Sequence, residues 1–325
     1  MNRYMTSVAA ALAGGIALAA ATFAQAQSFP AKDVRFVNPF PPGGTSDMIG
    51  RFLGEQFSKQ IGKQVVVENR TGANGAIAAA DVAKSPPDGH TILLASMSMM
   101  TVTPQMVQLP YDTERDLTPI GNVASVYNLL VVKSDSPFKT WQDVADAARN
   151  NPNKHTCATV GSGSSQQLSC ALFMSLTGGR LTQVPYRGGA PAIIDIVGGR
   201  VEMMFGNMPE FMGQIRGGNL RAVAFGASEA SPLLADVPVM SKTGLKDFVI
   251  HNWFGLVGPG GMSPDLQRRW NDELNKALAA PAVSDKLPEL GLIVVGGTPE
   301  EFAAHIRKET ARWADVVKRS GARVD

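Results

Sequence analysis

The amino-acid sequence predicts an α/β fold with two lobes joined by a two-segment hinge. The first observation is a repeated unit, in which a short apolar strand precedes a loop of Gly, Pro and Ser and then a helical pattern. This alternation is typical of α/β domains and favours largely parallel sheets. The second observation is that one strand and two helices follow residue 250, too little for an independent domain. We therefore expect this segment to return to the first lobe, so that the chain crosses between lobes near residues 127 and 250.

The first lobe begins with three short apolar segments of the kind that form buried strands. They lie at residues 34–37, 65–68 and 91–95. After the first, Pro41 to Ser46 break the strand, and residues 47–60 carry apolar side chains at helical spacing. After the second, residues 76–84 predict a helix, which the Ser-Pro-Pro-Asp-Gly segment at 85–89 ends.

The second lobe repeats this pattern from a strong strand at residues 128–133 onwards. We expect helices at 141–150 and 166–175 and strands at 156–160 and 201–205. A strand at 253–257 follows, and then two helices that begin at Ser263-Pro264 and Thr298-Pro299, where a hydroxyl N-cap precedes proline. These elements assign residues 27–126 and 250–325 to lobe 1 and residues 127–249 to lobe 2.

The N-terminus has the features of a signal peptide. Arg3 supplies a positive start, residues 8–21 form an apolar run, and Ala24-Gln25-Ala26 offers a small-x-small cleavage site. The run is shorter than the roughly 20 residues that a transmembrane helix needs. We expect residues 1–26 to be removed after Ala26 and the mature protein to be soluble in the periplasm.

The charge of the chain is nearly balanced. Its 325 residues carry a formal net charge of +2, with acidic and basic residues interspersed. That surplus is too small to indicate a nucleic-acid or anionic-membrane surface, so we expect neither partner and a monomeric protein. Any attraction for a charged ligand must come from a local site.

The sequence shows no pattern for metal binding or catalysis. The four histidines are scattered, no nucleotide-binding fingerprint occurs, and neither G-x-S-x-G nor H-E-x-x-H is present, so we expect no cofactor, no metal and no enzyme. Cys157 lies on an expected strand and Cys170 in the next helix. Export permits a disulfide between them, and two buried free thiols are the alternative.

Four Gly-rich loops follow strands and open helices, and they carry the predicted chemistry. They lie at residues 40–47, 72–75, 161–165 and 186–192. The first N–H groups of a helix lack partners and its dipole is positive there, so such ends bind anions. Ser96 and Asn207 also end strands, where open α/β sheets place ligands; whether Asn207 faces the cleft stays open. Asp47 fits a capping acid better than a ligand contact.

The order and spacing of several motifs resemble the Bug-type periplasmic solute-binding proteins of tripartite tricarboxylate transporters. The resemblance covers about residues 29–318. The motifs are Pro39-Phe40-Pro41-Pro42-Gly43-Gly44-x-x-Asp47, Val67-Glu68-Asn69-Arg70-x-Gly72-Ala73-x-Gly75, Pro86-Pro87-Asp88-Gly89-His90-Thr91, Pro185-Tyr186-Arg187-Gly188 and Pro191-Ala192-x-x-Asp195-x-x-Gly198-Gly199.

The resemblance implies a type II periplasmic-binding fold of two Rossmann-like lobes that close like a flytrap on a small carboxylate. It also implies delivery of that carboxylate to the membrane permease of such a transporter. A sensor subunit that feeds a membrane signalling protein is the alternative, and an enzyme on this scaffold is a weaker one. Carried over by position, the resemblance implies ligand contacts from lobe 1 at Phe40, Gly43, Gly44 and Thr45, and from lobe 2 at Ser162, Ser164, Ser165, Tyr186 and Gly188.

The sequence departs from its relatives at three places. Gln167-Leu168 stands where many have His-Leu, Asn74 stands where many have Gly, and Gly206 stands where some carry Asp. The missing acid at residue 206 weakens the case for a ligand with an ammonium group. It favours a plain organic or aromatic carboxylate.

Overall fold

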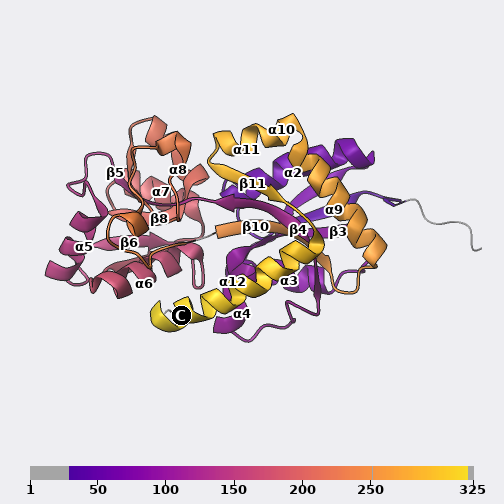
Figure 1. Ribbon diagram of the computed structural model, residues 1–325, viewed down its shortest axis with the longest axis horizontal. Coiled ribbons are helices and arrows are strands. Elements are labelled where there is room, and N and C mark those ends of the chain that lie inside the picture. The colour runs from indigo at the N-terminus through magenta and orange to yellow at the C-terminus, as the bar shows by residue number, and fades with distance from the viewer. Residues whose placement is uncertain (1–28, 251, 321–325) are drawn as a thin grey trace, which may run out of the picture.

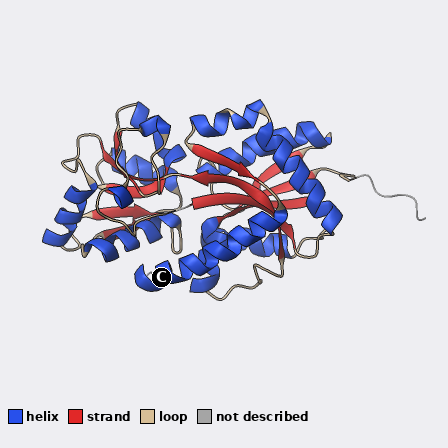
Figure 2. Cartoon of the chain, in the orientation of Figure 1, coloured by secondary structure: helices blue, strands red, loops and turns tan. Residues whose placement is uncertain are grey.

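Two β-sheets organise the protein into two lobes (Figure 1). The structure is a computed structural model that describes residues 29–250 and 252–320, so the expected signal peptide lies outside the described residues. Helices cover both faces of each sheet, as Figure 2 shows. No helix in the described part of the chain is long and apolar enough to cross a membrane.

The sheet of lobe 1 has six strands in the order β11-β4-β10-β3-β1-β2. The strands are β1 (Val34–Asn38), β2 (Val65–Asn69), β3 (Thr91–Ser96), β4 (Leu117–Val126), β10 (Asn252–Pro259) and β11 (Leu292–Gly296). Its helical elements are α2 (Thr45–Ile61), the short helix η1 (Ala73–Gly75), α3 (Ala76–Ala83), the π-helical turn η2 (Ser98–Val102), α4 (Thr103–Met106), α9 (Pro264–Ala279), α10 (Pro281–Ser284), α11 (Lys286–Glu289) and α12 (Pro299–Ser320). Helices α2 and α9 pack into one apolar cluster with this sheet, and α3 and α12 pack into another.

The sheet of lobe 2 has five strands in the order β7-β6-β8-β5-β9. The strands are β5 (Asn128–Lys133), β6 (Thr156–Thr159), β7 (Thr182–Pro185), β8 (Met203–Asn207) and β9 (Leu220–Phe225). Its helices are α5 (Trp141–Asn150), α6 (Ser165–Thr177), α7 (Gly189–Val197) and α8 (Met208–Arg216), and two short turns, η3 (Pro232–Leu234) and η4 (Met240–Lys242), precede β10. Helices α7 and α8 share an apolar cluster with this sheet.

The sheets are mixed, so the expectation of largely parallel sheets is wrong. Strands β1, β2 and β3 pair in parallel, as do β6, β7 and β8, but β10 runs antiparallel to both β3 and β4. The reason lies in the crossings. The chain leaves lobe 1 along β4 and returns along β10, and neighbouring strands that lead out and back must run in opposite directions.

Local signals explain why the elements begin where they do. Ser263 caps α9 by accepting a hydrogen bond from the Leu266 N–H, and Thr140 forms a capping box with Asp143 at the start of α5.

The edge strand β11 was not predicted from the sequence. Its residues alternate between buried and exposed, which is the period-two pattern of an edge strand.

The last helix, α12, does more than return to lobe 1. It packs on β4 and η2 and also contacts α6 of lobe 2, so it bridges the lobes (Figure 1). Near its end, Arg312 Nη2 donates a 2.5 Å hydrogen bond to the carbonyl of Val249. This helix therefore contacts both lobes, and its contact with α6 was not expected from the sequence. Buried apolar residues form one cluster that continues from α3 and α12 to α5 and α6.

Candidate functional site

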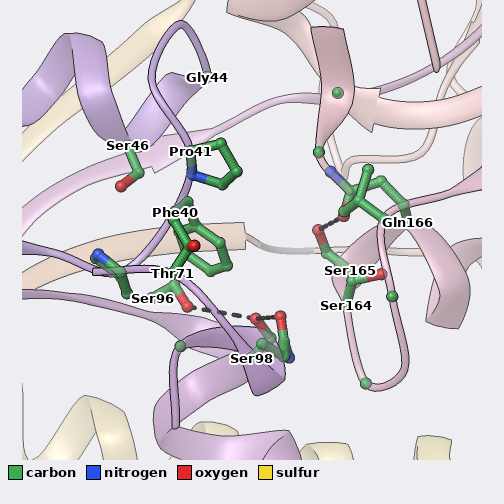
Figure 3. A pocket seen from close by; sticks show the side chains of 18 of the residues that line it. Phe40, Pro41, Gly44, Ser46, Thr71, Ser96, Ser98, Ser164, Ser165 and Gln166 are labelled. Atoms are coloured by element: carbon green, nitrogen blue, oxygen red, sulfur yellow. Dashed lines mark hydrogen bonds between the residues drawn. The ribbon is translucent and has the colours of Figure 1, made fainter. Parts of the chain in front are cut away.

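A cavity of about 670 Å³ lies where the two lobes meet. Figure 3 shows Phe40, Ser46 and Ser98 of lobe 1 on one side and Ser164, Ser165 and Gln166 of lobe 2 on the other. The walls come from the first residues of α2, α6, α7 and α8, together with the ends of β3 and β10. Four helix N-termini therefore open onto one cavity.

Ten of the eleven ligand contacts predicted from the sequence line this cavity. They are Phe40, Gly44, Thr45, Ser96, Ser162, Ser164, Ser165, Tyr186, Gly188 and Asn207. Gly43 does not line it, because its N–H donates a 3.0 Å hydrogen bond to Asp47 Oδ2 and its place is within the turn. Gly43 has φ of 85°, the left-handed region that glycine adopts readily. Its contact with a ligand stays a prediction.

The Phe40 loop is held by side chains behind it. Asn69 Nδ2 donates to the Phe40 carbonyl at 2.9 Å and to Asp47 Oδ1 at 3.0 Å. Ser46 Oγ donates to Asn38 Oδ1, and Asn38 Nδ2 donates to the Phe40 carbonyl at 3.4 Å. Strands β1 and β2 thus fix the position of the cavity wall.

Asp47 is the centre of this support. Arg51 Nε donates to Asp47 Oδ2 at 2.9 Å, in addition to the bonds from Gly43 and Asn69. Burial alone would raise the pKa of Asp47, but these hydrogen bonds outweigh it and lower the pKa. Asp47 does not line the cavity, which agrees with a structural role for this acid.

The loop of residues 161–165 is held by the helix that follows it. Ser164 caps α6 by accepting a 3.2 Å hydrogen bond from the Gln167 N–H, while Gln167 Oε1 accepts a 2.6 Å bond from the Gly163 N–H. Gln167 therefore braces this loop. Gly163 has φ of 75°, and a Cβ there would lie 3.4 Å from Asn74 Nδ2 of lobe 1.

Tyr186 is oriented by an acid on α7. Its hydroxyl donates a 2.6 Å hydrogen bond to Asp195 Oδ2, and Arg200 Nε donates to Asp195 Oδ1 at 2.8 Å. Burial, together with this carboxylate, raises the pKa of Tyr186 to about 12. The hydrogen bonds from Arg200 and Tyr186 lower the pKa of Asp195, which stays ionised and holds the ring against the cavity.

Hydrogen bonds join the lobes across the cavity floor. Asn252 Nδ2 on β10 donates to Asn207 Oδ1 on β8 at 2.7 Å and to Ser165 Oγ at 3.4 Å. Thr45 Oγ1 donates to Glu210 Oε1 at 2.9 Å. A Cβ on Gly188 would lie 3.4 Å from Pro41, so the Gly-rich loops of the two lobes face each other at close range. These contacts hold the two lobes together beside the cavity.

The lining residues that the sequence did not predict include three with polar or aromatic side chains near the cavity floor and walls. Asn252 lies at the start of β10, Phe254 lies two residues further on, and Glu210 lies in the first turn of α8. Asn252 and Phe254 flank a predicted crossing, a signal that could have drawn attention to them. Glu210 gave no such signal, because an acid in a first helical turn is ordinarily a capping residue.

The two cysteines are buried free thiols in the structure. Cys157 lies on β6 and Cys170 in α6, and a hydrogen bond with Cys157, together with burial, raises the pKa of Cys170. Of the two alternatives left open by the sequence, the structure has the thiol pair and not the disulfide. The described residues contain no group of three or more His, Cys, Asp or Glu side chains that could hold a metal.

Comparison with known proteins gives consistent matches over most of the chain. The family model described as "Tripartite tricarboxylate transporter family receptor" matches residues 49–322. The protein BugT of Bordetella pertussis is 34% identical over 315 residues, which cover 95% of this chain and 97% of BugT.

Solved structures are equally similar. The R. palustris protein Rpa4515, solved with adipate, is 31% identical with a TM-score of 0.87, and the match covers 91% of this chain and all of that one. MatC from Rhodopseudomonas palustris, solved with bound malate, is 30% identical with a TM-score of 0.84, over 89% of this chain and all of MatC. This similarity confirms the predicted two-lobed periplasmic-binding fold.

Proposed function

Because the chain belongs to the tripartite tricarboxylate transporter receptor family, we propose that it is a periplasmic receptor for a small organic carboxylate. The receptor captures the carboxylate between its lobes and delivers it to the membrane permease of such a transporter. Export after cleavage at Ala26, action as a monomer and binding without catalysis belong to the same proposal.

The observation that carries the proposal is the convergence of uncapped helix N-termini on one cavity. The N-caps of α2 and α7, Gly44 and Gly188, have no side chain that accepts from the first turn, and both residues line the cavity. The first N–H groups of such helix ends are donors for a carboxylate, although the Thr45 N–H of α2 already bonds to Glu210. The hydroxyls of Ser164 and Ser165 lie across the cavity from the start of α2 (Figure 3).

The binding free energy that a helix end can supply shows why the ligand needs contacts with both lobes. One helix dipole stabilises an anion by about 0.3–1 kcal/mol, or up to about 2 kcal/mol when partly buried. A micromolar ligand needs about 8 kcal/mol. No single loop can supply that, so a ligand that touches both lobes must bind the closed form more tightly than the open one, and this difference drives closure.

The ligands of two relatives support a carboxylate. Rpa4515 was solved with adipate and MatC with malate, and both share the fold of this chain at about 30% identity. The cavity adds an apolar wall formed by Phe40, Met106 and Phe254. A carboxylate with a hydrocarbon body fits such a wall.

A thermal-shift screen tests the receptor proposal. The protein is unfolded, dialysed and refolded to remove bound solutes, and mono-, di- and tricarboxylates are added one by one. A ligand at 100 times its Kd should stabilise the native state by about 2.7 kcal/mol and raise the melting temperature. Small-angle scattering with the ligand found should show a smaller radius of gyration than without it. A library of carboxylates that leaves the melting temperature unchanged would contradict the proposal.

A further inference from the structure

The cavity contains one acid, Glu210, whose surroundings are unusual. Glu210 Oε1 accepts hydrogen bonds from Thr45 Oγ1 at 2.9 Å and from Asn207 Nδ2 at 3.3 Å. Oε2 is shut off from solvent and has no hydrogen-bond partner among the described residues. A Cβ on Gly189 would lie 2.5 Å from Oε2, so this oxygen packs directly against residue 189 and fits there because that residue is glycine.

The partners of Glu210 favour its ionised form. The hydroxyl of Thr45 and the amide of Asn207 both donate to it, and no acceptor is placed to receive a proton from Oε2. The first turn of α8 and the N-terminus of α2 also stabilise a negative charge. Burial nevertheless raises the pKa of Glu210, although the hydrogen bonds from Thr45 and Asn207 oppose that rise. A buried carboxylate oxygen without a partner is costly, and a donor that reached it would remove the cost.

The charge of the cavity lining points to the kind of donor. Among the described residues that line the cavity, Arg187 and Glu210 are the two with charged side chains, and Arg187 is exposed. In the part of the chain that the structure describes, Arg187 and Glu210 do not form an ion pair with each other. A ligand whose second carboxylate lay beside Glu210 would bring two negative charges together without a buried cation to compensate for them. A ligand with one carboxylate and one donor matches the lining.

We propose that Glu210 determines the specificity of the pocket and selects monocarboxylates that carry an ammonium or hydroxyl group over dicarboxylates of the same length. This inference rests on the proposed carboxylate receptor and refines it. It reverses the preference drawn from Gly206, because Glu210 lines the cavity, whereas Gly206 does not and a Cβ there would meet the ring of Phe211. The carboxylate of the ligand binds at an uncapped helix end, and its ammonium or hydroxyl group donates to the Glu210 carboxylate.

Two matched series of ligands test the inference by isothermal titration calorimetry. One series is adipate, 6-hydroxyhexanoate and 6-aminohexanoate, and the other is succinate, 4-hydroxybutanoate and 4-aminobutanoate. In each series the length is constant and the distal group alone changes. We expect the wild type to bind the amino or hydroxy acid of at least one series tenfold or more tighter than the diacid. Glu210→Gln keeps the shape of the side chain and should reduce that preference about tenfold, whereas Glu289→Gln, which removes an exposed acid paired with Lys286, should not change it.

The outcomes separate this inference from the receptor proposal. Wild-type protein that binds the diacids tightest, or that binds none of the amino and hydroxy acids, overturns the role of Glu210 even when the wider screen finds a carboxylate ligand. A preference that survives unchanged in Glu210→Gln overturns it as well. The wild-type ranking needs no variant, so it decides the matter even if Glu210→Gln folds poorly.

Discussion

Replacing Asp47 with Asn should destabilise the protein by about 2–4 kcal/mol. The buried carboxylate accepts from the Gly43 N–H and from Asn69 Nδ2, both at 3.0 Å. A hydrogen bond to a charged group contributes about 1.5–3 kcal/mol. An Asn side chain keeps one acceptor oxygen, but its amide nitrogen is a donor and would face groups that are also donors. One of the hydrogen bonds from Gly43 and Asn69 is therefore lost, and the other is weakened.

Urea denaturation measures this loss. With a slope of about 3 kcal/mol per molar, a loss of 3 kcal/mol lowers the midpoint by about 1 M with the slope unchanged. Asp265→Asn is the matched control, because Asp265 is also an acid in a first helical turn but its side chain is 93% exposed. The control should stay close to the wild type. A variant at residue 47 within about 0.5 kcal/mol of the wild type would refute the reasoning.

The pH dependence gives an independent check on Asp47. Its pKa is lowered in the folded protein, so its stabilisation is fully present above the unfolded pKa of about 3.9 and is lost as pH falls through the folded value. The difference between wild type and Asp47→Asn should therefore shrink in acid. A difference that stays constant down to the lowest pH at which the protein folds would show that the charge is not the cause.

Two further substitutions test the local account of the helices. Ser164→Ala removes the N-cap of α6, which should cost about 1 kcal/mol in urea denaturation and weaken binding of the ligand found in the screen; unchanged stability would argue against the cap. Gly213→Ala should stabilise α8 by about 0.5–1 kcal/mol, because an added Cβ meets nothing within 4 Å and the helix gains a better helix former. A lower urea midpoint for Gly213→Ala would contradict this reasoning, because the added Cβ would then have met an unfavourable contact.

Much of the fold could be predicted from local signals. The helix at 141–150 and the start of α9 after Ser263 agree with the structure, because capping and periodicity act within one or two turns. The strand β11 was missed because a five-residue run between glycines carries too little pattern. The direction of β10 was missed because pairing across the sheet depends on the route of the chain between lobes.

In the candidate site, too, some features follow from local sequence and others depend on the tertiary structure. The sequence by itself determined the family, the Gly-rich loops and ten of the residues that line the cavity, since each lies at a strand end or helix start that its neighbours in sequence define. Only the tertiary structure decided that Thr45 meets Glu210 across 165 residues and that Asn252 contributes to the cavity floor. The physical reason is that a helix end is formed by residues a few positions apart, whereas the polarity inside a closed cleft is set by which side chains two separately folded lobes bring to the same place.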